Sequence, residues 1–292
     1  MSKKIDLYFS GLVRDASGTV GANVEKILDI CDDKSVGIGK IFIAENGSKD
    51  DTRDILKALE RDNSSIELQL FDDLDEEFPV REERIAHLRE SLFNSIYKST
   101  RSSLIDHSQL YIPIDLDSMI AQSINQSDFI EECKYVASGK TDAVFPVARP
   151  RYYDIYALRA KGWIETDCWK NVQKSRGLGR PLFPTVKYVY SNQKRLDELQ
   201  QLDRISVESA FGGLGIYNLN SLGDASYKSN GKLPKNFCEH VSFNSDVRYK
   251  EISTNLVVKA PQEHIRYHTS LIDKLIILSR LSLINIRETI SG

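Results

Sequence analysis

The sequence predicts an α/β protein whose mostly parallel central sheet is flanked by helices and followed by a helical C-terminal tail. Two observations predict this class. Apolar, strand-like runs alternate with helix-like segments through the first 120 residues, as in a doubly wound sheet. Three of these runs end in polar clusters, at residues 14–15, 45–48 and 115–117. Ligands of such sheets bind beyond the carboxyl ends of the strands, so we expect the three clusters to share one cleft.

The N-terminal part of the chain is expected to contain four strands and three helices. The helical pattern is clear in residues 20–30, because Val24, Ile27, Leu28 and Cys31 recur at three- and four-residue spacing. The expected strands are residues 5–12, 40–44, 66–71 and 110–114, and the expected helices are residues 20–30, 53–60 and 80–98.

The rest of the chain is less regular. Strands are expected at 142–147 and 152–159, and a helix that contains both tryptophans is expected at 162–174. A Gly-rich, basic loop follows at 175–181, and an extended segment covers 251–259.

The composition describes an ordinary globular chain with no general affinity for nucleic acid. The 292 residues are 41% hydrophobic and 28% charged, and 39 basic against 42 acidic residues give a net charge of −3. The four cysteines are scattered, which indicates reduced thiols rather than disulfides or a zinc site. Neither a signal-peptide core nor an apolar run of ~18–20 residues is evident. We therefore expect a cytoplasmic protein, with the inner face of the cell membrane as the alternative location.

The chemistry is expected to centre on Asp115 and Asp117, at the end of the fourth strand. In an extended chain, residues i and i+2 point to the same face, so the two carboxylates converge. Two anions held this close repel each other unless a cation lies between them, and a hard divalent ion with oxygen ligands fits. The pair predicts a Mg²⁺ or Mn²⁺ site. The alternative is an acidic strand end that faces water.

Six segments carry a family resemblance, and the first three resemble glycosyltransferases of the GT-A type, whose fold is Rossmann-like. The six are E-N-G-S-x-D-x-T at 45–52, R-x-x-x-x-R at 84–89, D-x-D at 115–117, YYDIYALR at 152–159, SAFGGLGIY at 209–217 and CEHVSFN at 238–244. The last three resemble the capsule-associated mannosyltransferase family and its bacterial relatives. The resemblance implies metal-dependent transfer of a sugar from a UDP- or GDP-linked donor to a glycan or glycolipid, in surface polysaccharide or lipopolysaccharide synthesis.

The resemblance also divides the chain and assigns donor-binding residues. Arg14, Glu45, Arg84 and Arg89 would bind the nucleotide sugar, with Glu45 accepting a hydrogen bond from the ribose or base. Arg84 and Arg89 are about 140° apart on a helix, so a solvated face is the alternative for either. The expected parts are a nucleotide-sugar-binding half at 1–120, an acceptor-binding half at 121–262, and a C-terminal amphipathic helix at 263–292.

A metal held by Asp115 and Asp117 would bridge the two phosphates of the donor and stabilise the departing diphosphate as a Lewis acid. GT-A enzymes often add a ligand from late in the chain. His240 is the expected third ligand, with His264 and His268 as further candidates and a purely structural histidine as the alternative.

Acceptor activation is expected from Glu239, which would be the general base of an inverting reaction, with Glu208 and Asp167 as further candidates. A retaining reaction would need no base in that role. Gly212 and Gly213 would let the backbone approach the donor sugar closely, unless they form only a tight turn.

Two further groups could contact substrates. Arg176 and Arg180 of the basic loop would close over the diphosphate. The aromatic residues that would form an acceptor wall, or else pack in the core, are Tyr152, Tyr153, Trp163 and Trp169.

The tail is strongly apolar from Leu271 to Ile284, so we expect it to pack on the protein, on a homodimer partner or at a membrane surface. Two other functions remain open at this point. One is a sugar-nucleotide nucleotidyltransferase, although residues 11–18 match the phosphate motif of that class poorly. The other is a non-catalytic protein that binds a glycan or nucleotide.

Overall fold

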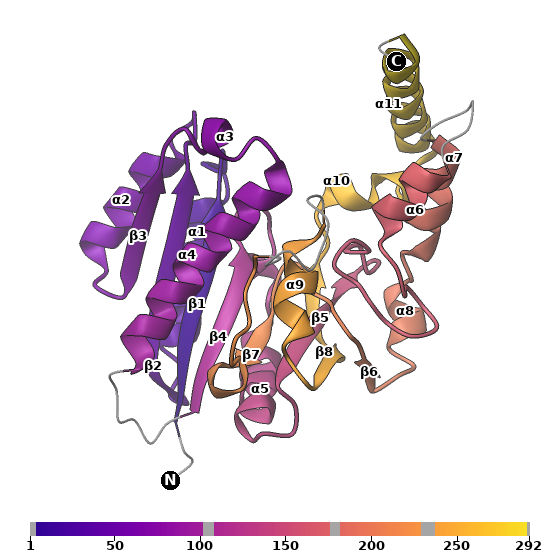
Figure 1. Ribbon diagram of the computed structural model, residues 1–292. Helices are drawn as coiled ribbons and strands as arrows, with labels where there is room; N and C mark the ends of the chain where they lie inside the picture. The colour runs from indigo at the N-terminus through magenta and orange to yellow at the C-terminus, as the bar shows by residue number, and fades with distance from the viewer. Residues whose placement is uncertain (1–3, 102–107, 176–181, 229–236, 291–292) are drawn as a thin grey trace.

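The computed structural model describes residues 4–101, 108–175, 182–228 and 237–290 of the chain. One sheet runs through the described residues (Figure 1). Its strands, in spatial order, are β3 (Ile66–Phe71), β2 (Val36–Asn46), β1 (Ile5–Val13), β4 (Ser108–Asp115), β7 (Ile216–Asn218), β5 (Ala143–Arg149), β8 (Lys250–Lys259) and β6 (Arg204–Ser206).

The sheet is mostly parallel, as predicted. β1 pairs in parallel with β2 and with β4, and β2 pairs in parallel with β3. β7 is antiparallel to both β4 and β5, so β5 and its parallel neighbour β8 run in the same direction as β4. β6 closes the far edge as an antiparallel strand. The carboxyl ends of the central strands therefore meet at one edge of the sheet.

Helices cover both faces of the sheet (Figure 1). One face carries α1 (Val20–Cys31), α2 (Thr52–Asp62) and α5 (Gln126–Ala137), and the other carries α4 (Arg81–Arg101) and α9 (Glu239–Ser245). The other helical segments are α3 (Leu74–Glu77), α6 (Cys168–Lys174), α7 (Leu182–Tyr188), α8 (Leu196–Leu199), α10 (Gln262–Ile265) and α11 (Leu271–Ile290), with 3₁₀ turns η1 (Ala121–Ser123), η2 (Tyr190–Asn192), η3 (Leu219–Ser221) and η4 (Arg266–His268).

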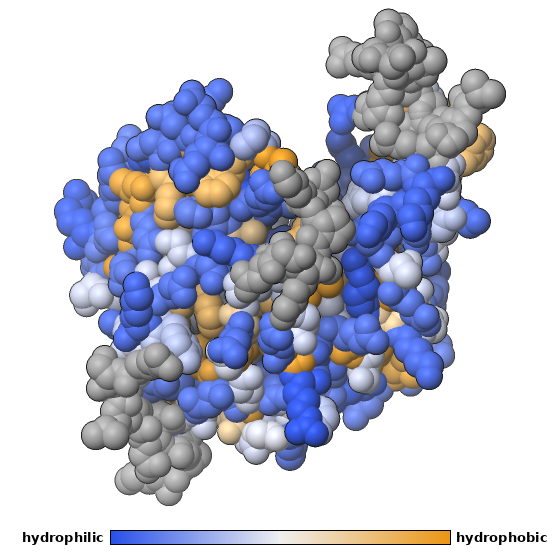
Figure 2. All heavy atoms as spheres, in the orientation of Figure 1, coloured by the Kyte–Doolittle hydropathy of each residue, from blue (hydrophilic) through white to orange (hydrophobic). Residues whose placement is uncertain are grey.

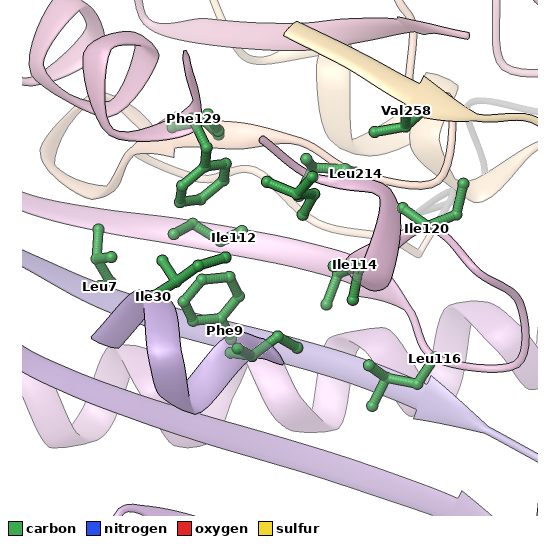
Figure 3. Packing of buried hydrophobic residues seen from close by; sticks show 14 of the residues in the cluster. Leu7, Phe9, Ile30, Ile112, Ile114, Leu116, Ile120, Phe129, Leu214 and Val258 are labelled. Atoms are coloured by element: carbon green, nitrogen blue, oxygen red, sulfur yellow. The ribbon is translucent and has the colours of Figure 1, made fainter. Parts of the chain in front are cut away.

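The central strand β4 is buried on both faces, which explains its continuous apolar run. Figure 3 shows Ile112 and Ile114 in the cluster that also contains Phe129 of α5. On the opposite face, the ring of Tyr111 lies 5.8 Å from that of Phe243 in α9. Most of the surface seen in Figure 2 is hydrophilic, so the apolar side chains are concentrated in these two layers.

Residues 152–159 differ from the prediction, because the structure has a loop there rather than a strand. The buried carboxylate of Asp154 accepts a hydrogen bond from the backbone N–H of Gly212 (2.9 Å), which ties this loop to a second one. The helix expected at 162–174 begins only at Cys168. Asp154 also accepts from the backbone N–H of Ala157 (3.2 Å), and such a local bond competes with strand pairing.

The predicted helical tail is present as α11, which projects away from the sheet at the C-terminal end of the chain (Figure 1). Its first residues are strongly exposed, with Leu271 at 75% and Ile272 at 69%. Among the described helices, none is both long enough and apolar enough to cross a bilayer.

Candidate active site

A cleft of about 620 Å³ opens at the carboxyl ends of β1, β2 and β4. Arg14 follows β1, Asn46 ends β2, and Asp115 and Asp117 end β4. All four side chains line the cleft, so the three polar clusters of the sequence do meet. The opposite wall comes from the second half of the chain, including the loop after β5, α6, α9 and α10.

A buried arginine connects the two acidic motifs of the cleft. Arg89 of α4 donates from Nη2 to Oδ1 of Asp115 (2.8 Å) and from Nε to Oε1 of Glu239 (3.1 Å). Only 4% of its side chain is exposed. Burial alone would lower the pKa of Arg89, but Asp115 and Glu239 outweigh burial and raise it, so the guanidinium stays charged. Burial raises the pKa of Glu239, and Arg89 opposes this rise.

Two aromatic rings complete the surroundings of this arginine. The guanidinium lies 4.8 Å from the ring centroid of Phe211, and the ring of His240 stacks on Phe211 with centroids 3.6 Å apart. The Nη1 atom of Arg89 is buried and has no hydrogen-bond partner within the described part of the chain. Arg89 also lines the cleft, so this unpaired donor lies in the wall of the cleft.

Asp117 is exposed to the cleft, two residues beyond Asp115. The atoms around the cleft desolvate its carboxylate and Asp115 repels it, which together raise the pKa of Asp117 to about 6. The backbone N–H of Asp115 donates to the carbonyl of Gly213 (2.9 Å), which fixes the strand end next to the Gly-rich turn. The arrangement favours a proton or a cation at Asp117.

The oxygen atoms at the end of β4 fit a hard divalent ion whose remaining coordination positions are filled by substrate and water. Asp115 and Asp117 supply carboxylate oxygens, and the buried hydroxyl of Ser118 beside them has no hydrogen-bond partner among the described residues. Across those same residues, no group of three or more His, Cys, Asp or Glu side chains is arranged to hold a metal. Mg²⁺ needs few protein carboxylates and takes its other ligands from substrate phosphates and water.

The three candidate histidines take different positions. His240 is 3% exposed, packs against Phe211 and lies 3.3 Å from Oε1 of Glu239. Burial lowers its pKa, which keeps the ring neutral. His264 lines the cleft, whereas His268 contacts the carbonyl of Tyr190. Both His240 and His264 line the cleft, so His240 as the third metal ligand stays a prediction, with His264 as a further candidate.

Arginines from the loop after β1 and from α4 form a basic rim on the N-terminal side of the cleft, next to Glu82. Arg14 makes a two-pronged pair with Asp75 of α3, with both distances 3.0 Å, and Arg84 lies 3.0 Å from the same carboxylate. Arg81 also lines the cleft. Arg84 and Arg89 both face the cleft despite their five-residue spacing, because the cleft follows α4 along two turns. The alternative of a solvated helix face therefore does not apply to these two residues.

Glu45 takes a different position from the one expected. Its carboxylate is fully buried, accepts from the backbone N–H of Ser48 and from Nε of Arg53, and does not line the cleft. The following turn is bound to the loop after β1, where Ser48 accepts from the N–H of Asp15 (2.9 Å). Glu45 and the turn that follows it thus stabilise the ends of the strands, and Asn46, rather than Glu45, lines the cleft.

Gly212 and Gly213 form a tight turn rather than a surface of the cleft. Their φ angles are +68° and +84°, in the left-handed region that favours glycine. A Cβ at Gly213 would lie 2.7 Å from the hydroxyl of Tyr153 and 2.9 Å from Ile120. The turn seats Asp115 through the Gly213 carbonyl, so these glycines act on the site through the backbone.

We expect Gly213→Ala to destabilise the protein by about 2–4 kcal/mol, measured by denaturant unfolding, because strain at positive φ adds to overpacking. Gly139→Ala is the matched control: φ there is +75°, but a Cβ would meet nothing within 4 Å. It should cost only about 1 kcal/mol. Equal losses in the two variants would show that the close approach to Tyr153 and Ile120 is unimportant.

Aromatic side chains line one wall of the cleft, but only two of the four expected residues are among them. Tyr153 and Trp169 line the cleft as expected, whereas Tyr152 and Trp163 pack against each other with ring centroids 5.2 Å apart. The second half of the chain adds two rings that the sequence did not indicate, Tyr156 and Tyr190.

Other expected residues lie elsewhere. Asp167 caps α6 by accepting from the N–H of Lys170 (2.9 Å), and neither it nor Glu208 lines the cleft. Arg176 and Arg180 lie outside the described residues. The polar cleft residues that sequence reasoning missed include Asn46, Arg81, Glu82, Ser118, Asp154, Gln193 and Glu263. Of these, Arg81 had a signal, because it precedes Arg84 by three residues on the same helix face.

No protein-family model and no curated protein sequence matches the chain. Similar solved structures include S. aureus TarS 1–349, with 11% identity over 97% of this chain and a TM-score of 0.45. The chain spans 65% of that TarS fragment.

Two further similar structures are synthases. Glucosyl-3-phosphoglycerate synthase from Mycobacterium tuberculosis, in complex with Mn²⁺, UDP and glucosyl-3-phosphoglycerate, has 14% identity, a TM-score of 0.37 and coverage of 98% of this chain and 79% of that one. Mannosyl-3-phosphoglycerate synthase from Rubrobacter xylanophilus has 10% identity, a TM-score of 0.40 and coverage of 98% and 74%. Similarity at this level assigns no activity, so the function must be argued from the residues of the cleft.

Proposed function

We propose that the chain is a metal-dependent glycosyltransferase of the GT-A type, which moves a sugar from a nucleotide-diphosphate donor to a glycan or glycolipid. The observation that carries this proposal is the pair Asp115 and Asp117 at the end of the central strand β4. The pair lies in a cleft whose rim is basic and whose far wall is aromatic. The carboxylate pair suits a metal, the basic rim suits a diphosphate, and the aromatic wall suits a sugar ring.

Asp115 and Asp117 would hold Mg²⁺ or Mn²⁺, with His240 as the predicted third ligand and His264 as a further candidate. The raised pKa of Asp117 supports this role, since desolvation and then the neighbouring Asp115 disfavour its charged form, and a bound cation would offset both. When bound, the ion supplies Lewis-acid stabilisation of the charge on the leaving diphosphate.

Arg14, Arg81 and Arg84 would bind the phosphates of a UDP- or GDP-linked donor. Guanidinium groups recognise phosphate oxygens in two-pronged geometry, and Arg14 already holds the carboxylate of Asp75 in this way. Arg89 has a different role, because its charge is used inside the protein to hold Asp115 against Glu239. It orients the first metal ligand.

Glu239 would act as the general base if the reaction inverts. It lines the cleft, and burial raises its pKa, which makes it a stronger base than an exposed carboxylate. The resemblance to capsule-associated mannosyltransferases supports surface polysaccharide or lipopolysaccharide as the product.

We expect a screen of nucleotide sugars by thermal unfolding to find one donor that raises the Tm only when Mn²⁺ or Mg²⁺ is present. A ligand at about 100 times its Kd stabilises the folded state by about 2.7 kcal/mol. UDP-linked and GDP-linked donors should differ, and EDTA should remove the effect. Stabilisation by every donor regardless of metal would contradict the proposal. Pyrophosphate release from a nucleoside triphosphate and a sugar phosphate would instead indicate a nucleotidyltransferase.

A further inference from the structure

The exposed face of α11 is apolar. Its exposed apolar side chains, which are 39–75% exposed, are Leu271, Ile272, Leu275, Ile276 and Leu283. At 3.6 residues per turn these side chains fall within about half of the helix circumference. The polar residues Asp273 and Lys274 lie on the other side and are half-buried, whereas Ser279 and Arg280 are exposed beside the apolar side chains. A soluble helix normally has the opposite arrangement, so this face requires an apolar environment.

A strongly basic stretch adjoins this helix in space. The described residues 168–175 and 182–196 contain five Lys or Arg and no Asp or Glu, in a chain whose net charge is −3, and Arg195 among them pairs with Asp197 (2.6 Å). Lys170, Lys174 and Lys187 of this stretch are exposed on α6 and α7, and α7 also exposes 74% of Phe183. α6 packs against α7, and α7 contacts α11 (Figure 1).

We propose that these elements form a docking surface for an anionic lipid bilayer. The docking surface consists of Lys170, Lys174, Phe183 and Lys187 together with the exposed apolar face of α11. Aliphatic and aromatic side chains would enter the headgroup region, while the lysines would contact anionic headgroups. This inference goes beyond the proposed function and does not depend on it.

The positive charge of the docking surface favours an anionic bilayer over a second copy of the chain or nucleic acid. A second copy of the chain would bring two basic stretches together, which like-charge repulsion disfavours. Nucleic acid would match the lysines but would leave the Leu and Ile side chains of α11 in water. An anionic bilayer satisfies both groups at once. Trp169 of α6 is 42% exposed and lines the cleft, so a docked protein would present its cleft beside the lipid surface.

The test is co-sedimentation of the full chain with phosphatidylcholine vesicles, with or without phosphatidylglycerol. We expect binding only to the anionic vesicles, and weaker binding when salt rises from about 0.1 M to about 1 M. Binding to both vesicle types alike, or to neither, would overturn the proposal. A salt-stable dimer in sedimentation velocity that Leu271→Ser with Leu275→Ser converts to monomer, without vesicle binding, would assign the face to a second copy.

Matched variants distinguish binding through the docking surface from a general effect of the charge of the protein. Charge reversal in the docking surface should weaken binding by about 100-fold, because each basic residue near the membrane contributes about 1 kcal/mol. The three substitutions are Lys170→Glu, Lys174→Glu and Lys187→Glu. The control reverses three exposed lysines of the N-terminal half: Lys34→Glu, Lys40→Glu and Lys57→Glu. If the control weakens binding as much, binding is not confined to this surface and the proposal fails.

Discussion

Asp117→Asn is expected to lower kcat/KM for sugar transfer by about 1,000-fold, which corresponds to about 4 kcal/mol of transition-state stabilisation. The amide keeps the size of the side chain but loses the charge that would hold the metal. The metal-dependent rise in Tm should disappear in the same variant. Donor turnover and thermal unfolding, each with and without Mn²⁺, measure the two effects.

The same substitution should stabilise the protein in the absence of metal. The folded-state pKa of Asp117 is raised to about 6, above the ordinary value of an aspartate, so ionisation at this position opposes folding. The cost is absent below about pH 4 and is complete above about pH 6. At pH 8 Asp117→Asn should raise the Tm by about 2 °C, after allowance for the screening of an exposed group. At pH 4 the two proteins should unfold alike.

The control for both effects is Asp62→Asn, because Asp62 is 65% exposed and pairs only with the exposed Arg61 within the described chain. It should change neither turnover nor the response to Mn²⁺. Full activity or an unchanged metal response in Asp117→Asn would remove this residue from the metal site. A lower Tm at pH 8 would contradict the repulsion between Asp115 and Asp117.

Much of the N-terminal half could be predicted from the sequence, because its signals are local. Apolar runs of five to nine residues alternate with helical patterns, and each strand forms within a few residues of its expected position. The convergence of Arg14, Asp115 and Asp117 followed from a general rule for parallel sheets. The strands and the location of the cleft could therefore be predicted without knowing the tertiary contacts of any side chain.

The errors arose where the role of a residue depends on a distant partner. Glu45 ends a strand as a ligand-binding carboxylate would, but Arg53 on α2 neutralises it inside the protein. Residues 152–159 have the composition of a strand, but Asp154 binds the backbone of a loop some 58 positions away. The pairing of Arg89 with Glu239 spans 150 positions, and no local pattern indicates it.

Arg89→Met is expected to destabilise the folded protein by about 3–5 kcal/mol, because it leaves two buried or half-buried carboxylates without their cation. Asp115 and Glu239 lose hydrogen bonds of 2.8 and 3.1 Å, and methionine fills much of the space. The loss should be larger at pH 8 than at pH 5. Without Arg89 the pKa of Glu239 rises further above its unfolded-state value, so protonation at low pH relieves the unpaired charge.

Two comparisons attribute this loss to the ion pairs of Arg89. Arg195→Met breaks a pair with Asp197 in which both side chains are more than half exposed, so it should cost less than about 1 kcal/mol. Adding Glu239→Gln to Arg89→Met removes one of the unpaired charges and should recover part of the stability, which a double-mutant cycle in urea measures. If Arg89→Met costs no more than Arg195→Met, or if the cycle shows no coupling, Arg89 does not hold the two acidic motifs together. A large coupling would mean that Arg89 fixes Asp115 at the strand end against Glu239 of α9, so that the metal pair and the proposed base keep one geometry.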